Sequence, residues 1–235
     1  FIALSHWNRC FVGRAEKLLE RALVHAERAD DRHWRDNILA MRGLSNVSGP
    51  TPAEEGLRHC ADLLARTREA RSTVALLTSY SAVLEAMCNR FDAAREKAAR
   101  GTALLEDLDR RVTAAGSGYF AARVELLADE PVRAEAIARP ALDTLEQLGE
   151  TVNSAVVAML LAESLCRQSR FDEAESATET SERLAWPDDI HAQVGWRAAR
   201  AQAYSGRGEA QRGEELAREA IGLLEGADDL DLRGD

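Results

Sequence analysis

Apolar residues recur along the chain with the spacing of α-helices, and short turn signals separate the helical stretches. Between residues 92 and 109, for example, Ala94, Ala98, Leu105 and Leu108 fall on one face of a helix with 3.6 residues per turn. Gly and Pro stand at the joints between such stretches, as at residues 49–52 and 206–208. The pattern predicts an all-α protein.

The predicted helices alternate between two sets. The first set covers approximately residues 1–10 (a remnant), 33–46, 72–88, 112–128, 151–168 and 189–206. The second set covers approximately residues 13–29, 52–70, 92–109, 131–148, 172–185 and 209–226. Asp92 and Asp172 open two helices of the second set, and we expect their carboxylates to act as N-caps.

A repeat of about forty residues links these helices into pairs. The segments RFDAA at 90–94 and RFDEA at 170–174 lie eighty residues apart. The small residue that closes each segment recurs at Ala15, Gly56, Ala94, Ala134, Ala174 and Gly213, with separations of 41, 38, 40, 40 and 39 residues. A second small residue precedes the last four of these by twelve positions, at Ala82, Ala122, Ala162 and Ala201. Small residues at both places let paired helices approach closely.

This period predicts one repeat domain over residues 1–235, built as an α-α superhelix of about six helix-turn-helix units. The units cover approximately residues 1–30, 31–71, 72–110, 111–149, 150–188 and 189–228, and a seventh begins at 229–235. A single pair cannot bury its own apolar face, so stacking of pairs forms the core and leaves a concave surface lined by the first helices. Because the chain begins at Phe1, we expect a fragment of a larger protein.

Composition and charge narrow the function. Apolar residues make up 46% of the chain and aromatic residues only 5%, which favours helices packed through Ala and Leu. The formal net charge of −10 disfavours direct contact with nucleic acid or a membrane surface. Lys occurs only at residues 17 and 97, and we attribute the excess of Arg to genomic composition.

Candidate chemistry is sparse. The four cysteines form no CxxC pair, and the five histidines form no HExxH or i, i+4 pair, so neither a metal nor a cofactor is predicted. Unpaired cysteines fit a reducing cytoplasm. The sequence offers no cluster of acids, bases or nucleophiles, and we expect no enzymatic activity from this chain.

The repeat units resemble tetratricopeptide (TPR) repeats, although forty residues exceed the usual 34. This resemblance implies that the superhelix is right-handed. The stretches GPTPAEEGLRHCADLL, AESLCRQSRFDEAE, QVGWRAARAQ and DDLDLRGD are similar to actinobacterial proteins that join a class III nucleotide cyclase-type domain, an AAA/STAND-type ATPase and a TPR array. Related arrays occur in large ATP-binding regulators of the LuxR type and in the maltose-operon activator. The resemblance implies a module of a signal-transduction protein. A phosphate-binding GxxxxGK[ST] loop is missing from this chain, so the resemblance implies ATPase chemistry outside it.

Alignment of the first helices on TPR geometry gives the candidate groove residues. They are Ser79, Val83, Tyr119, Arg123, Met159, Glu163, Arg167, Ala198 and Gln202. Tyr and Arg are favoured anchors of interfaces, which favours a peptide or protein partner. Solvated faces, or contacts to the next unit, are the alternative interpretation of these positions.

A second candidate cluster lies on the helix predicted at 189–206. It comprises Gln193, Trp196, Arg197 and Arg200. Packing between repeats, with Arg stacked on Trp, and ligand binding are both open interpretations of it.

We therefore expect a cytoplasmic, non-catalytic interaction or sensor module. Its partner would be a peptide, a protein or the ATPase domain of its own parent protein, bound in the concave groove. The alternative is a receptor for a small-molecule effector, as the resemblance to the maltose activator implies.

Overall fold

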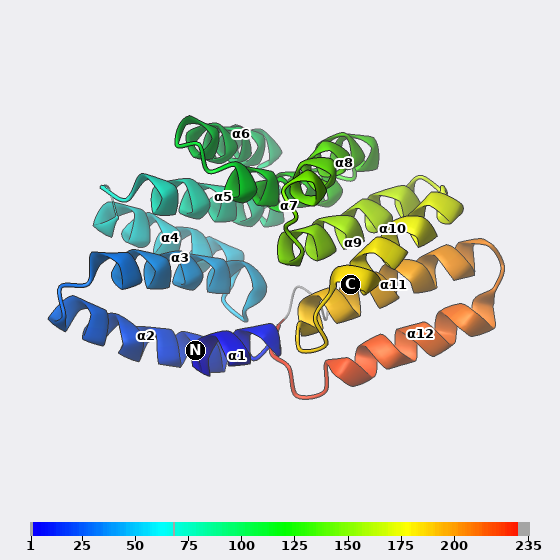
Figure 1. Cartoon of the computed structure of the whole chain (residues 1–235), viewed down its shortest axis with the longest axis horizontal. Helices are drawn as coiled ribbons and strands as arrows, with labels where there is room; N and C mark the ends of the chain where they lie inside the picture. Colours follow the sequence, from blue (N-terminus) through cyan, green and yellow to red (C-terminus); the bar gives the residue numbers. More distant parts are fainter. Residues whose placement is uncertain (1, 68, 230–235) are drawn as a thin grey trace. The chain divides into compact units, whose positions relative to one another are not determined.

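The computed structural model describes residues 2–67 and 69–229, which form twelve α-helices and contain no β-strand. The helices of the first half are α1 (Ile2–Asn8), α2 (Val12–Arg28), α3 (Arg32–Ser48), α4 (Ala53–Arg66), α5 (Arg71–Met87) and α6 (Phe91–Asp107). Those of the second half are α7 (Arg111–Leu127), α8 (Pro131–Gln147), α9 (Val152–Arg167), α10 (Phe171–Leu184), α11 (Ile190–Gly206) and α12 (Ala210–Leu223). The twelve predicted helices are confirmed, with ends within a few residues (Figure 1).

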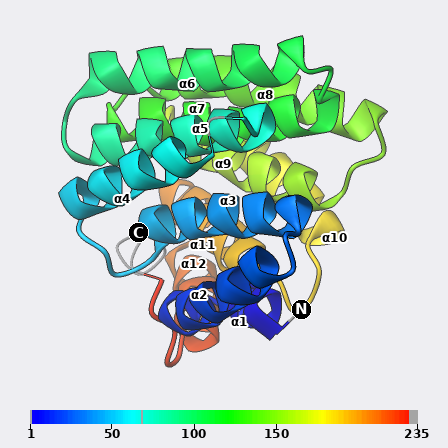
Figure 2. The same ribbon diagram turned by 90° about the vertical axis from the view of Figure 1, so that its left-hand side faces the viewer.

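The described residues divide into two compact units. Unit 1 comprises the residues up to 111 together with 227–229, and unit 2 comprises residues 112–226. Within unit 1, α3 lies between α2 and α4 (Figure 2). A single repeat domain over the whole chain remains a prediction, and the seventh repeat predicted at 229–235 lies, except for Asp229, outside the described residues.

A left-handed turn ends most of the helices and sets the length of the repeat. Its central residue has positive φ, as at Asn89 (59°), Asp129 (57°) and Gly149 (69°). The next amide then bonds back into the helix, and Arg90 N donates to Glu85 O at 2.9 Å. Helices α5 to α8 have 17 residues each and begin twenty residues apart. Two such helices with their turns account for the forty-residue period.

The arginine of each RFD segment reaches back to the preceding helix pair. Arg170, directly before α10, donates from Nη1 to Glu135 Oε2 of α8 at 2.5 Å and from Nη2 to Glu173 Oε2 at 2.6 Å. Arg90, directly before α6, bonds to Glu54 at the start of α4 and to Glu85 at 3.1 Å. Both arginines therefore tie successive second helices together.

The phenylalanine and the aspartate of the second RFD segment reach forward instead. The ring of Phe171 lies against Gly206 at the end of α11, where an added Cβ would stand 2.2 Å from the ring. Asp172 accepts a hydrogen bond from Arg207 Nη1 at 2.9 Å. The prediction that Asp92 and Asp172 are N-caps is wrong, because α6 and α10 begin one residue earlier, at the phenylalanine, and the arginine takes the cap position.

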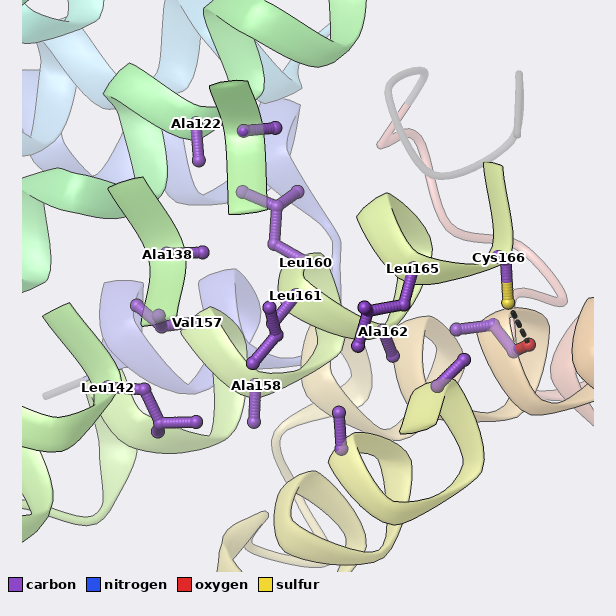
Figure 3. Close-up of a cluster of buried hydrophobic side chains, with 14 of the residues drawn as sticks. Ala122, Ala138, Leu142, Val157, Ala158, Leu160, Leu161, Ala162, Leu165 and Cys166 are labelled. Carbon is purple, nitrogen blue, oxygen red and sulfur yellow. Dashed lines mark hydrogen bonds between the residues drawn. The ribbon is translucent and has the colours of Figure 1, made fainter. Parts of the chain in front are cut away.

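The core of unit 2 is built from small and branched apolar residues, as the sequence predicted (Figure 3). Ala122, Ala162 and Ala174 have no exposed surface, and Leu160 and Leu165 of α9 are 1% exposed. Burying one such leucine fully stabilises the fold by roughly 1.5–3 kcal/mol. Helix α9 is apolar on most sides because α8, α10 and α11 surround it.

Unit 1 is discontinuous in sequence. Residues 227–229 return to the start of α2, where the Asp228 carboxylate accepts hydrogen bonds from Gly13 N at 3.1 and 3.2 Å. Asp228 N donates in turn to Cys10 O at 3.1 Å. A negative charge at this helix N-terminus satisfies a first-turn amide and complements the helix dipole.

We predict that Gly206→Ala destabilises the protein by about 1–3 kcal/mol, because the new methyl group displaces the Phe171 ring. Gly222→Ala, in α12, is the matched control, since no atom apart from those of its chain neighbours and its own helix backbone lies within 4 Å of its added Cβ. This control should gain up to about 1 kcal/mol from helix propensity. Urea unfolding of both variants checks the prediction, and equal effects would contradict it.

We predict that Glu135 stabilises the fold at neutral pH and loses this effect in acid. Burial opposes its ionisation, but hydrogen bonds from Arg139, Gln168 and Arg170 outweigh burial and lower the pKa of the carboxyl below its ordinary 4.5. A lowered folded-state pKa means that the stabilisation is complete above the unfolded value and disappears as pH falls through the folded one. Glu135→Gln should therefore be less stable than the parent at pH 7, with the difference shrinking below pH 4.5.

Thermal unfolding between pH 7 and pH 3 measures this difference. Glu179→Gln is the control, because Glu179 is exposed and makes no hydrogen bond or ion pair with another described residue. A constant difference between Glu135→Gln and the parent across the whole range would refute the assigned role.

Candidate functional site

The predicted groove residues of α5 lie inside the fold. Ser79 is 1% exposed and Val83 is 0% exposed. The Ser79 hydroxyl donates to Ala75 O at 3.2 Å and faces Gly101 of α6, where an added Cβ would come within 2.3 Å of it. Ser79 therefore packs α5 against α6, and both residues are too deeply buried to contact a partner.

In unit 2 the structure brings three predicted residues together. Glu163 of α9 lies between two arginines, with its Oε2 3.6 Å from Arg123 Nη1 and its Oε1 2.7 Å from Arg167 Nη2. Arg167 also donates from Nη1 to the backbone oxygen of Leu126 in α7 at 2.9 Å. The Arg123 side chain is only 8% exposed, whereas that of Arg167 is 38% exposed. The ion pairs Arg123–Glu163 and Glu163–Arg167 therefore join α7 to α9, and the guanidinium of Arg167 is the part that faces solvent.

Tyr119 of α7 extends the same face toward α11. Its hydroxyl lies 3.2 Å from His191 Nε2, and the two rings meet edge to face with centroids 5.9 Å apart. Met159, also predicted, is 7% exposed, and its sulfur fills the space beside Gly195. Three successive first helices thus contribute to one polar and aromatic surface. His191 was not predicted, because its lone position in the sequence gave no ligand spacing.

The Trp196 cluster joins α11 to α10. Trp196 is 4% exposed, and its ring centroid lies 4.0 Å from the Arg197 guanidinium carbon and 4.5 Å from that of Arg200. Arg200 donates from Nε to Thr178 Oγ1 at 2.8 Å, and its Nη1 lies 2.8 Å from Glu182 Oε2. Such contacts are those of packing between helix pairs.

The remaining predicted residues of α11 differ in their exposure and in their contacts. Gln193 accepts at Oε1 from Trp196 Nε1 at 3.3 Å and from Arg197 Nη1 at 2.7 Å, which orients both side chains. Ala198 is half-buried and Gln202 is exposed. Gln202 is therefore available to a partner, whereas Gln193 is engaged within the fold.

Unit 1 contains a hollow that the sequence analysis did not predict. Its volume is about 750 Å³, and it lies on the side of the second helices, with α5 as its floor and α4 and α6 as its walls. The lining residues are Glu54, Leu57, Arg58, Ala61, Leu64, Val74, Thr78, Ser81, Glu85, Arg90, Lys97 and Arg100. The only sequence feature that points to this hollow is the apolar stripe Leu57–Ala61–Leu64. Its i, i+4, i+7 spacing is also that of ordinary core residues, so the spacing alone does not indicate a binding surface.

A similar hollow of about 450 Å³ lies between α2 and α4, above α3. It is lined by Val12, Gly13, Glu16, Lys17, Arg42, Ser45, Asn46, Pro50, Thr51, His59, Asp62, Leu63 and Arg66. Arg42 pairs with Glu16 across it at 2.6 Å, and Arg66 pairs with Glu27 at 2.7 Å. The architecture of the two hollows is the same, but the arginines of this one are engaged.

The described residues contain no group of three or more His, Cys, Asp or Glu side chains placed to hold a metal ion. Burial raises the pKa of the Cys60 and Cys166 thiols to about 11, so both stay protonated at neutral pH. None of the helices in the described part combines the length and the apolar character that crossing a bilayer requires.

The sequence matches no protein-family model and no curated protein. Its fold does resemble solved structures. A Rap protein complexed with the Competence and Sporulation Factor has a TM-score of 0.69 at 10% identity, over 97% of this chain and 74% of that one. BtubC (BKLC) from P. vanneervenii has a TM-score of 0.63 at 17% identity, over 92% and 91%.

A putative kinesin light chain with TPR-like repeats from Podosopora anserina has a TM-score of 0.54 at 14% identity, over 73% of this chain and 86% of that one. At these identities the likeness concerns the fold. The chain therefore has a TPR-like helical-repeat fold, as predicted. A relation to the actinobacterial ATPase proteins remains a prediction.

Proposed function

We propose that this chain is a non-catalytic interaction module that binds a peptide or protein segment on the first-helix face of unit 2. We define this face by Tyr119, Arg123, Glu163, Arg167 and His191. The observation that carries the proposal is that α7, α9 and α11 place these side chains next to one another, through Arg123–Glu163–Arg167 and Tyr119–His191.

The energetics of this face suit recognition. Arg123 is buried against Glu163, and Glu163 in turn fixes the outer guanidinium of Arg167. A side chain that is already held in place loses little conformational entropy when a partner binds. Tyr and Arg are also the residue types most often found as binding hot spots. The exposed part of Arg167 can donate hydrogen bonds to a carboxylate or a backbone carbonyl of a partner.

Two further observations support an interaction role. The charged groups of the face are engaged in ion pairs with one another. The Rap protein of similar fold was solved with a factor bound to it. We extend this behaviour to the present chain as part of the proposal.

We further propose that the module belongs to a larger bacterial signalling ATPase or transcriptional regulator in the cytoplasm. This part rests on the resemblance of the sequence to the TPR arrays of such proteins. In that setting the partner is a regulatory protein or the ATPase domain of the same chain, and binding shifts the balance between active and inactive states.

The proposal predicts that peptides selected against the chain from a library of short peptides bind the first-helix face. Arg167→Gln should weaken the selected peptides by about tenfold, or about 1.4 kcal/mol, because it removes a charge-assisted contact. Arg183→Gln is the control, since Arg183 lies on α10, is 63% exposed and stands 3.8 Å from its nearest carboxylate, Glu146. Fluorescence anisotropy at equal ionic strength measures both variants.

Three outcomes count against the proposal. The selected peptides bind the Arg167→Gln variant as well as they bind the parent. Sugars or nucleotides, and no peptides, raise the unfolding temperature, which favours a small-molecule receptor. The purified chain turns over ATP, which contradicts a non-catalytic module.

A further inference from the structure

We propose that the hollow between α4 and α6 is a second binding site, which takes an acidic, amphipathic helical segment of a partner protein. This site lies in unit 1, on the side of the second helices. It does not depend on the first-helix face of unit 2 described above.

The walls of the hollow differ in chemistry. On α4, Leu57, Ala61 and Leu64 form an apolar stripe that is half-buried or exposed. On the opposite wall, Lys97 and Arg100 stand one turn apart on α6. A segment lying between these walls is therefore apolar where it faces the α4 stripe and acidic where it faces Arg58, Lys97 and Arg100.

The charge of the hollow favours an acidic occupant. Its lining has four basic residues and two acidic ones, although the whole chain has a formal net charge of −10. Glu54 is already bonded to Arg90, and Glu85 is bonded to Arg90 and to Lys97 at 2.5 Å. These pairs neutralise both acids from within the lining.

Two guanidinium groups of the lining have no acidic partner among the described residues. Arg58 and Arg100 are exposed, and neither makes an ion pair with a described residue. They stand on opposite walls, one on α4 and the other on α6. Carboxylates of a bound partner can therefore pair with Arg58 and Arg100 without displacing a carboxylate of the chain itself.

Glu85 fixes the shape of the basic wall. Burial opposes its ionisation, but hydrogen bonds from Lys97 and Arg90 prevail and lower the pKa of its carboxyl. It therefore remains an anion at neutral pH and holds Lys97 and Arg90 in place across the floor. An ordered wall of this kind reduces the entropy lost on binding.

The length of the hollow sets the size of the occupant. Its floor runs along α5 from Val74 through Thr78 and Ser81 to Glu85. At 1.5 Å per residue this stretch is about 16 Å long, which fits a helical segment of about eleven residues. The hydroxyls of Thr78 and Ser81 donate hydrogen bonds to backbone oxygens of their own helix, each at 2.7 Å. These two hydroxyls therefore need no hydrogen bond from the occupant.

Nucleic acid also carries negative charge, but the hollow favours a polypeptide. The apolar stripe on α4 matches apolar side chains and offers nothing to a phosphate backbone. The strong negative charge of the surrounding chain repels a polyanion that extends beyond the hollow.

A labelled helical peptide of about twelve residues, with Glu along one side and Leu along the other, is the probe. We expect it to bind the parent chain with an affinity that falls as salt is added. Arg58→Glu combined with Arg100→Glu should weaken it at least tenfold. Arg21→Glu combined with Arg28→Glu is the control, because both residues are exposed on α2, outside the hollow, and the change in net charge is equal. The control should bind as the parent does.

The unfolding temperature of each variant shows whether it is folded before binding is compared. A photo-crosslinker on the peptide then reports its position, and attachment to α4 and α6 is the expected result. The proposal is overturned if the parent does not bind the peptide, if both double variants bind equally weakly, or if crosslinks fall on α7, α9 or α11. It is also overturned if a single-stranded oligonucleotide binds more tightly than the peptide.

Discussion

Close approach between the two helices of a pair is the constraint on which each unit depends. Ala82 and Ala94 have no exposed surface in α5 and α6, and Gly101 leaves no room for a methyl group beside Ser79. Since a larger side chain would separate the helices, the apolar stripes on either side would lose their contacts. The small residues found at forty-residue intervals are thus the points where backbones meet, and the stacking of pairs follows from them.

The RFD segment shows how neighbouring pairs are joined once each pair has closed. Arg170 reaches back to Glu135, Phe171 reaches forward to Gly206, and Ala174 is buried within its own pair. A single turn therefore contacts three successive pairs. Arg suits this position better than Lys, because its planar fork of donors serves two carboxylates at once, here those of Glu135 and Glu173.

The helices and their pairing were predictable because the signals for them are local and repeated. The binding surfaces, namely the groove and the hollow, were harder to predict from the sequence. Val83 was assigned to a groove from the repeat register, but α5 has neighbours on most sides, and the register alone does not reveal which side is open. The hollow in unit 1 depends on how far α4 and α6 stand apart above α5, and on the pairing of Glu85 with basic residues that follow it in sequence. Neither is encoded in a motif.

The return of residues 227–229 to α2 has a consequence for the order in which the protein is made. The Gly13 amide at the start of α2 finds its carboxylate partner on Asp228, 215 positions later. The N-terminal part of a chain leaves the ribosome first, so α2 and its neighbours emerge long before Asp228 has been synthesised. Unit 1 is therefore completed only after the whole of unit 2 has been translated.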